Sequence, residues 1–374
     1  MSGFATLDDT DSPVRVVLVG AGAMGRHWIG ALLASKDVTL VGLVDLDLGL
    51  AVRVVDELEL AGVVVGTSVS AVAASAGAQA AVNVTVPGAH YAVTTEALFA
   101  GLPVLSEKPI APTVSQGLAL AAAAEASGKL LMTSQSRRYY RTLAEFRREI
   151  ATLGTVGIVT TEFFRGPHFG GFRDEMEQPL LVDMAIHAFD VARYLLDANP
   201  TSVYCETFNP EWSWYRGDAA AIATFEFDGG IRYGFSGSWC SEGMQTSWNG
   251  NWRASGSNGS TTWDGETAPR TERLRASEVD GDEAEYPAGE EIAGALAEFV
   301  SALRTGDTPS GAVHSNIQSL AMVEAATQSA DSGKRIAIAG LLEEAYAEAL
   351  GVEKTPAIRA VLEGWGSARG GLEL

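Results

Sequence analysis

The sequence contains little cysteine, little positive charge and no long apolar stretch. Its 2 cysteines, Cys205 and Cys240, are too few for a disulfide framework and lack the spacing of a zinc site. Its 26 lysines and arginines against 47 aspartates and glutamates give a net charge of −21, which disfavours binding to nucleic acid or anionic membranes. No stretch is long enough to span a membrane, and the first residues lack the basic and apolar parts of a signal peptide. We therefore expect a cytoplasmic protein with no metal site, no nucleic-acid partner and no membrane association.

The length and composition are those of an ordinary globular protein with two domains. Hydrophobic residues make up 47% of the chain and charged residues 20%, which leaves enough apolar material for a large core. The 374 residues exceed the roughly 250–300 at which a single core stops growing. The pattern of expected strands and helices changes near Gln135, so we expect one domain at residues 1–134 and a second at residues 135–374.

Short apolar segments alternate with helical segments through the first of these domains. Strands are expected at Val14–Val19, Val38–Val44, 80–86, 103–105 and 129–133. Helices are expected at 26–34, 49–60, 91–100 and Val114–Ser127. Strands that alternate with helices are joined by right-handed crossovers, so the pattern predicts a parallel sheet covered on both faces. The expected fold class is α/β, with an N-terminal doubly wound Rossmann sheet.

Longer alternating strands and fewer helices characterise the remaining sequence. Strands are expected at 158–164, 202–208, Ala220–Phe227, 231–238, 252–255 and 261–263. Helices are expected at 142–150, 183–196, 290–304 and 316–330. Asp228-Gly229 and Asn258-Gly259 separate pairs of strands and are typical of hairpin turns. The pattern predicts an α+β domain with antiparallel strands, and the acidic segment after Gly340 has helical spacing but no assignable role.

A glycine-rich turn lies between the first expected strand and the first expected helix. It reads Gly20-Ala21-Gly22-Ala23-Met24-Gly25, in the strand–turn–helix context that a dinucleotide-binding turn requires. Gly20 permits the tight turn, Gly22 lets the backbone approach a pyrophosphate, and Gly25 allows the helix to pack closely on the strand. The N–H groups of the helix N-terminus then bind the phosphates, with Ala23 and Met24 beside the cofactor.

Asp45 supplies the second half of this signature. It ends the second expected strand, where a carboxylate accepts hydrogen bonds from the ribose hydroxyls of NAD. The same carboxylate repels a 2′-phosphate, and the next residue, Leu46, offers no compensating cation. The sequence therefore predicts NAD rather than NADP. Asp47 is a rival for the ribose contact but lies past the end of the strand.

Two other segments carry candidate catalytic residues. Lys108 follows a short strand in Glu107-Lys108-Pro109, so its ammonium group can polarise a substrate oxygen at the carboxyl edge of the sheet. Asp183 and His187 are four residues apart, which places them on one face of an α-helix. An imidazole titrates near neutral pH and suits removal of a hydroxyl proton. From these residues alone, a surface lysine and a helix-bracing Asp–His pair remain open alternatives.

Taken together, these motifs resemble the Gfo/Idh/MocA oxidoreductases, a family that includes glucose–fructose oxidoreductase and inositol dehydrogenase. The resemblance extends from about Val14 to Ser332 and implies a Rossmann domain plus an α+β domain with a large, mostly antiparallel open sheet that often forms a dimer or tetramer interface. It implies that Lys108 is the catalytic lysine, His187 the general base and Asp183 the ligand of a substrate hydroxyl. It further implies roles near the cofactor for Pro87, His90 and Glu107, and near the substrate for Arg138.

Specificity is expected to come from the second domain. His168 and Arg173 lie in a glycine-rich segment, 166–174, just before the helix that carries Asp183. Arginine side chains here could bind an anionic group on a sugar, although a solvated surface role is an alternative for each. The candidates are Arg138, Arg165 and Arg173. Tryptophans at 212, 214, 239, 248, 252 and 263 are candidates for stacking on a sugar ring or for the sheet core.

Three functions remain open on the sequence. The first is an NAD-dependent dehydrogenase of a sugar, polyol or inositol that acts as a homodimer or homotetramer. The second is an NAD-dependent glycoside hydrolase on the same scaffold, which oxidises a ring alcohol transiently, eliminates the aglycone, adds water and reduces again. The third is a non-enzymatic NAD sensor, against which the retention of Lys108, Asp183 and His187 argues.

Overall fold

The structure, a computed structural model, describes residues 3–276 and 286–372 and divides the chain into two compact units. The first unit contains Met1–Ser136, Ala288–Ile317 and Leu342–Leu374, and the second contains Arg137–Pro287 and Gln318–Leu341. The first break lies two residues from the expected one at 134. The chain then returns to the first unit twice, whereas we expected everything after residue 134 to form the second domain. Local patterns do not reveal such returns, because they depend on which apolar faces meet in space.

Six parallel strands form the sheet of the first unit, in the order β3-β2-β1-β4-β5-β6. This is the strand order of a doubly wound Rossmann fold. The strands are β1 (Val14–Val19), β2 (Val38–Val44), β3 (Val64–Gly66), β4 (Ala80–Asn83), β5 (Val104–Ser106) and β6 (Leu131–Thr133). The predicted parallel sheet is confirmed. Strand β3 was not predicted, because its three residues are too few to form a recognisable pattern.

The register of these strands aligns their carboxyl ends. Val19 is paired with Val44 on one side and with Asn83 on the other. Asn83 is paired in turn with Ser106. The residues that follow each of these positions therefore emerge at one edge of the sheet, where doubly wound folds bind their ligands.

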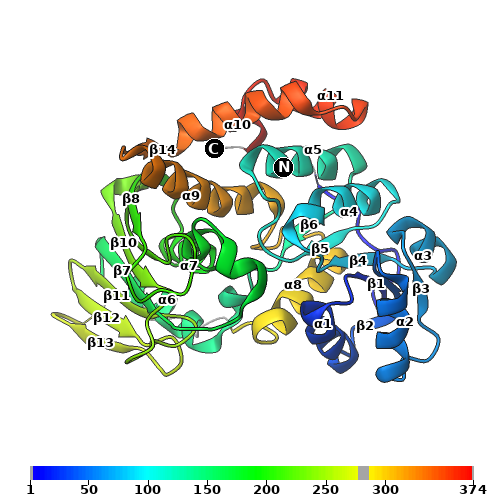
Figure 1. Cartoon of the computed structure of the whole chain (residues 1–374), viewed down its shortest axis with the longest axis horizontal. Helices are drawn as coiled ribbons and strands as arrows, with labels where there is room; N and C mark the ends of the chain where they lie inside the picture. The colour runs from blue at the N-terminus through cyan, green and yellow to red at the C-terminus, as the bar shows by residue number, and fades with distance from the viewer. Residues whose placement is uncertain (1–2, 277–285, 373–374) are drawn as a thin grey trace. The chain divides into compact units, whose positions relative to one another are not determined.

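Helices cover both faces of this sheet (Figure 1). They are α1 (Ala23–Ala34), α2 (Leu48–Glu57), α3 (Val69–Ala76), α4 (Pro87–Phe99) and α5 (Val114–Ser127). Helix α4 begins four residues earlier than expected, because Pro87 occupies the first helical position, where its missing N–H and fixed φ are tolerated. Helix α3 was not predicted.

The acidic C-terminal segment belongs to the first unit. The returning helices are α8 (Glu291–Thr305), the start of α9 (Val313–Ser332), the end of α10 (Ile338–Val352), α11 (Pro356–Trp365) and α12 (Ala368–Leu372). Helix α11 lies against α5 (Figure 1). The side chain of Trp365 donates to Glu125 of α5 at 3.2 Å, and His314 contacts the same carboxylate at 2.7 Å. Of the helices formed by the described residues, none is apolar enough over sufficient length to cross a bilayer.

A second anchor joins this segment to α4. The hydroxyl group of Tyr91 donates a hydrogen bond to the buried carboxylate of Glu353. Burial and this contact raise the pKa of Tyr91. Burial acts to raise the pKa of Glu353 as well, but hydrogen bonds from Tyr91 and Thr355 leave it below its ordinary value. The ionised carboxylate is therefore the form that the fold holds.

The second unit is built on an eight-stranded sheet in the order β13-β12-β11-β7-β10-β9-β8-β14. Only β7 and β10 are paired in parallel among these described strands, so the expected mostly antiparallel sheet is confirmed. Its strands are β7 (Val156–Phe164), β8 (Pro200–Phe208), β9 (Ala220–Phe227), β10 (Arg232–Ser238), β11 (Asn251–Gly256), β12 (Gly259–Trp263), β13 (Arg270–Arg273) and β14 (Ile336–Ala337). Helices α6 (Arg141–Ala151) and α7 (Ile186–Leu196) lie on the same face of it (Figure 1).

Both expected hairpin turns are present, one of them shifted by a residue. The turn between β9 and β10 is formed by Asp228, Gly229 and Gly230, and both glycines have positive φ. Between β11 and β12 the register places Gly256 opposite Gly259. The connecting residues there are 257 and 258, and Gly259 is the first residue of β12 rather than part of the loop.

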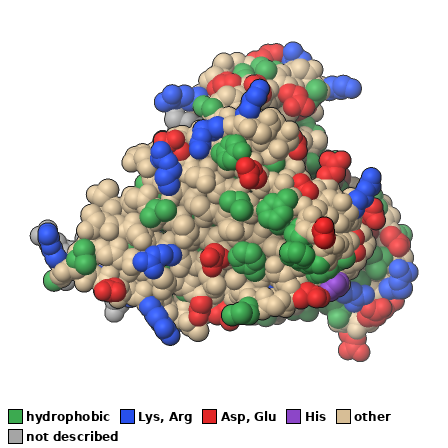
Figure 2. Space-filling view, turned by 60° about the vertical axis from the view of Figure 1, so that its left-hand side comes forward, with side chains coloured by type: hydrophobic (Ala, Val, Ile, Leu, Met, Phe, Trp, Pro, Cys, Tyr) green, Lys and Arg blue, Asp and Glu red, His purple; other side chains and the backbone are tan. Residues whose placement is uncertain are grey.

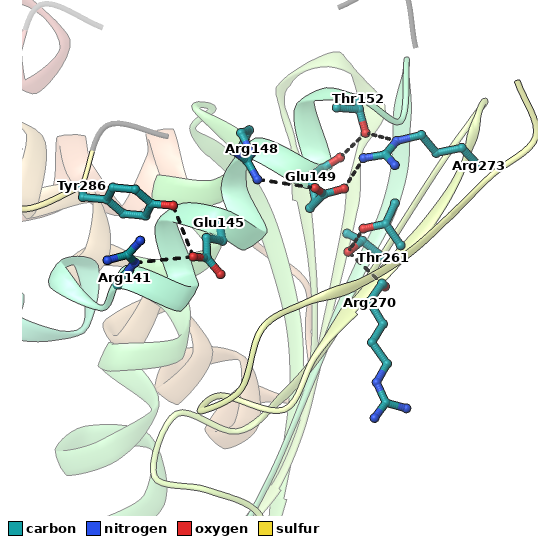
Figure 3. Close-up of polar contacts among 10 residues, drawn as sticks. Arg141, Glu145, Arg148, Glu149, Thr152, Thr261, Arg270, Arg273 and Tyr286 are labelled. Carbon is teal, nitrogen blue, oxygen red and sulfur yellow. Dashed lines mark hydrogen bonds and ion pairs between the residues drawn. The ribbon is translucent and has the colours of Figure 1, made fainter. Parts of the chain in front are cut away.

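Charged side chains fasten the edge strand β13 to helix α6 (Figure 3). The guanidinium group of Arg273 donates to the hydroxyl of Thr152 at 2.8 Å and is paired with Glu149. Strand β13 was not predicted, because three of its four residues are charged and it has no apolar alternation. Charge of this kind also keeps an exposed sheet edge from pairing with other chains.

The contact between α11 and α5 predicts how much the C-terminal segment contributes to stability. Leu362 of α11 is completely buried, so Leu362→Ala is expected to lower the free energy of unfolding by about 2–5 kcal/mol. Arg359→Ala on the exposed side of the same helix is the matched control and is expected to change it by no more than about 0.5 kcal/mol. Urea denaturation measures both, and equal effects would contradict the packing described.

Candidate active site

The glycine-rich turn of the first unit fits a dinucleotide. Gly20 has φ of 110°, which favours glycine, and its N–H donates to the carbonyl of Val44 at 2.7 Å. A Cβ atom on Gly25 would lie 2.0 Å from the carbonyl oxygen of Gly20, so only glycine allows α1 to approach the turn. A Cβ atom on Gly22 would meet no protein atom within 4 Å, which leaves open space in front of this backbone. Gly22 is also the N-cap of α1 and offers no capping side chain, so the first N–H groups of the helix can bind phosphate oxygens.

The two aspartates at the end of β2 have different surroundings. Asp45 accepts a hydrogen bond from the backbone N–H of Ala21, 2.8 Å away in the glycine-rich turn. Asp47 caps α2 by accepting from the N–H of Leu50 at 3.0 Å, and it faces Arg53 at 3.7 Å. Asp45 therefore lies at the turn that fits the dinucleotide, while the rival candidate Asp47 is used by its own helix.

The Glu107-Lys108-Pro109 segment leaves β5 at the same edge of the sheet. The Glu107 carboxylate is 9% exposed and accepts a hydrogen bond from the indole N–H of Trp28 at 2.8 Å and from the backbone N–H of Lys108 at 3.1 Å. The peptide bond between Lys108 and Pro109 is cis, and Lys108 is half-buried. Glu107 thus connects the lysine-bearing loop to α1, the helix that follows the glycine-rich turn.

His90 is buried within the first unit rather than exposed toward a ligand. Its Nδ1 lies 2.7 Å from the carbonyl oxygen of Pro109 and its Nε2 lies 2.9 Å from that of Thr85. Burial lowers the pKa of His90, and the two carbonyl contacts oppose this shift. The ring has no exposed surface, and its expected place near the cofactor stays a prediction. The ring connects the turn after β4, near Pro87, to the Lys108 loop.

In the second unit, Asp183 and His187 lie on two successive helical segments. Asp183 is in a π-helical segment, Leu180–Ala185, and His187 is in the first turn of α7. The predicted continuous α-helix is therefore interrupted by a wider turn, in which hydrogen bonds run to the fifth residue. This offsets side chains four apart from the same-face alignment expected of an α-helix. Both side chains are half-buried.

An arginine contacts the carboxylate of Asp183. The Nε atom of Arg173 donates to Oδ2 of Asp183 at 2.6 Å. Arg173 follows Gly170 and Gly171, which both have positive φ and turn the chain back toward the helix. The expected substrate residue Arg173 is thereby brought next to the expected substrate residue Asp183.

Arg138 and His168 have other surroundings. Arg138 is 6% exposed and binds Asp190 of α7 through two hydrogen bonds of 2.7 Å. Ser319 donates to the same carboxylate at 2.6 Å, and burial together with Arg138 lowers the pKa of the neighbouring Arg193 to about 10. This buried cluster holds Arg138 against α7, and the expected role of Arg138 near the substrate stays a prediction. His168 is exposed, stacks on Trp214 at 3.8 Å and contacts Glu242 at 2.9 Å.

Three of the six candidate tryptophans belong to the core of the second unit. Those at 239, 252 and 263 are buried, and that at 212 is exposed. Trp248 is half-buried, and the guanidinium group of Arg165 lies 4.4 Å from its ring centre. His187 and Trp248 share a cavity of about 20 Å³, which has room for a water molecule and not for a sugar.

Two family models match the chain. A model of an oxidoreductase family with an NAD-binding Rossmann fold matches residues 14–135, and a model of the GFO/IDH/MocA C-terminal domain matches residues 147–262. Together they cover more than half of the chain. The chain belongs to the Gfo/Idh/MocA oxidoreductase family. NAD is its cofactor, in agreement with the open backbone at Gly22 and the position of Asp45.

Sequence identity to individual relatives is low, between 18% and 30% for the three that follow. An uncharacterized protein, y4oX, of Sinorhizobium fredii is 28% identical over 348 residues, which are 88% of this chain and 97% of that protein. Inositol 2-dehydrogenase 4 of Saccharopolyspora erythraea is 30% identical over 194 residues, 51% of this chain and only 56% of the enzyme. A crystal structure of an oxidoreductase from Agrobacterium radiobacter with NAD+, L-tartaric acid and magnesium covers 88% of this chain and 99% of its own, with 18% identity and a TM-score of 0.75. This last likeness shows the fold alone.

Two residues of this Gfo/Idh/MocA chain support the site without having been singled out in the sequence. Trp28 binds Glu107, and Asn83 accepts hydrogen bonds from the backbone N–H and hydroxyl of Thr85 at 3.2 and 2.7 Å. Trp28 lies three residues after Gly25, so it is on the buried face of the helix that follows the turn. That spacing could have indicated a core position, but not its hydrogen bond to Glu107.

Substitutions of Gly22 and Gly25 are expected to have different effects on stability and on NAD binding. Gly22→Ala meets no protein atom, so it is expected to keep the free energy of unfolding and to weaken NAD binding by at least about tenfold, or about 1.4 kcal/mol. Gly25→Ala is the matched control and is expected to reduce both, because its methyl group would overlap the carbonyl of Gly20. Calorimetric titration with NAD and urea denaturation measure the two effects. Unchanged NAD affinity in Gly22→Ala would place the pyrophosphate elsewhere.

Proposed function

We propose that this protein is an NAD-dependent dehydrogenase that oxidises a secondary ring hydroxyl of a sugar, polyol or inositol. The observation that carries the proposal is the half-buried imidazole of His187 shortly after the carboxylate of Asp183, in a domain of the Gfo/Idh/MocA type. The relative named inositol 2-dehydrogenase supports this substrate class. A sensor of NAD has no use for a proton acceptor of this kind.

Each side chain has a distinct role in this proposal. His187 removes the proton of the hydroxyl group that is oxidised, and Lys108 donates a hydrogen bond to the same oxygen and stabilises its developing negative charge. Asp183 accepts a hydrogen bond from a neighbouring hydroxyl and fixes the orientation of the ring. The bound nicotinamide supplies the hydride acceptor.

Four buried residues hold these groups in position. Glu107 and His90 hold the loop that presents Lys108. Arg138 and Asp190 fix α7, whose first turn carries His187. Because these supports are buried and paired, the proton-accepting and proton-donating groups need little reorganisation when substrate binds.

His187→Ala provides the test of this proposal. Loss of the base is expected to lower kcat by about 10²–10⁴-fold while the Kd for NAD is unchanged. His27→Ala, which removes an exposed histidine, is the control and is expected to keep the wild-type rate. NADH absorbance on a panel of inositols, aldoses and hexose derivatives measures turnover. Full activity of His187→Ala would remove the proposed base, and release of nitrophenol from nitrophenyl glycosides without net NADH would indicate the glycosidase instead.

We further propose that a second copy of the chain covers the face of the eight-stranded sheet that α6 and α7 leave open. Four large apolar side chains point to this face, Ile158, Tyr204, Phe208 and Ile222, and the last is 51% exposed. In Figure 2 hydrophobic side chains on the visible surface are interspersed with acidic and basic ones. A surface on which apolar side chains are mixed with polar and charged ones is typical of a polar interface between two copies of a chain.

Ile222→Arg tests this assembly. A charge at the centre of a self-associating face repels its own copy, so the mass measured by light scattering is expected to fall from a multiple of 39.2 kDa to that of one chain. Leu33→Arg, at an exposed apolar position of α1, is the matched control and is expected to leave the mass unchanged. A wild-type protein of 39.2 kDa would exclude the proposal.

A further inference from the structure

We propose that the substrate is a sugar acid and that Arg173 binds its carboxylate beside the hydroxyl held by Asp183. This inference rests on the proposed dehydrogenase function and narrows its substrate class. It begins from the pairing of Arg173 with Asp183, in which Nε donates to Oδ2 at 2.6 Å.

The pairing uses only one of the donors of Arg173. A guanidinium group carries five N–H groups, one on Nε and four on the two terminal nitrogens. Within residues 3–276 and 286–372, the structure gives the terminal nitrogens no hydrogen-bond partner. The side chain is 33% exposed, so these nitrogens remain accessible next to a carboxylate that is only 20% exposed.

Two aromatic rings restrict the orientation of the guanidinium group. Its central carbon lies 5.2 Å from the ring centre of Phe169 and 4.8 Å from that of Phe172. Together with the bond to Asp183, these contacts limit the rotation of a side chain that otherwise loses considerable entropy when it binds. The planar pair of terminal nitrogens is therefore ordered before the substrate arrives.

A carboxylate is the group that such a planar pair binds best. Two parallel N–H groups match the two oxygens of a carboxylate, and this geometry gives both strength and selectivity. A neutral polyol offers only single hydroxyl groups at this position, so it forms weaker hydrogen bonds with the guanidinium group. The net charge of the chain is −21, so most of its surface repels anions. An accessible guanidinium group on such a protein attracts an anion locally, which supports a carboxylate as the ligand of Arg173.

Two nearby charged groups, Arg165 and Glu175, do not remove this preference. Arg165 already donates to the carbonyl of Thr246 at 2.8 Å and stacks on Trp248. Glu175, two residues after Arg173, faces Arg216 at 3.6 Å, which reduces its repulsion of an anion. The carboxylate of the substrate would therefore share Arg173 with Asp183 rather than compete with a fully formed bidentate pair.

The experiment compares acid and neutral members of matched pairs on the NAD-loaded protein. The probes are D-glucuronate with D-glucose, D-galacturonate with D-galactose, and D-gluconate with D-glucitol. We expect kcat/KM to be at least about tenfold higher for the acid of at least one pair, and Arg173→Gln to abolish that preference through KM. Arg173→Lys, which keeps the charge but loses the fork, is expected to restore part of it. Arg359→Gln, which removes an exposed arginine of α11 that is paired only with Glu363, is the control and is expected to keep the wild-type preference.

Binding separates this inference from the proposed function. Calorimetric titration of the NADH-loaded protein with the same pairs does not depend on turnover. An acid that binds at least about tenfold more tightly than its neutral partner, with the difference lost in Arg173→Gln, supports the inference even if no NADH forms from any probe. Oxidation of neutral and acid members with equal kcat/KM would contradict the inference and leave the proposed dehydrogenase function unaffected. Equal binding of both members, or binding of neither, also overturns it.

Discussion

The alignment of four strand ends in the first unit is the constraint on which the cofactor site depends. Val19, Val44, Asn83 and Ser106 are neighbours across the sheet, so the next residues of all four strands emerge together. A shift of one residue in β2 would carry Asp45 away from the N–H of Ala21, and a shift in β5 would carry Glu107 away from Trp28. Because a buried parallel sheet allows no such slip without exposing apolar side chains, core packing fixes the polar geometry at its edge.

Buried polar contacts extend this constraint to the loops. Glu107 and His90 each join two backbone segments that are distant in sequence, and both are nearly or completely inaccessible. A buried carboxylate or imidazole without partners would be costly, so these groups hold their segments in one arrangement. The same reasoning applies to Arg138 and Asp190 in the second unit. These buried residues of the motifs thus support neighbouring residues that are more accessible.

The sequence indicated the parts of this molecule that depend on local patterns. Strands β1, β2 and β9 and helix α5 have their predicted bounds, because apolar runs between turn residues have few alternative structures. The edge strand β13 and the three-residue β3 were missed, since one is charged and the other is short. The order Gly20, Gly22, Gly25 and Asp45 indicated the cofactor correctly, because strand, turn and helix follow one another without interruption. The partners of Glu107 and Arg138 could not be predicted, because Trp28 and Asp190 lie 79 and 52 residues away.

The π-helical segment before α7 shows how sequence and geometry diverge at the site. The spacing of Asp183 and His187 alone predicts one α-helix, yet Leu180–Ala185 forms a wider turn. A π turn forms weaker hydrogen bonds than an α turn, so it persists where tertiary contacts compensate for it. Those contacts are visible: Leu180 and Leu181 are completely buried, and Arg173 holds Asp183. The wider turn therefore places Asp183 next to Arg173, while α7 keeps its own packing.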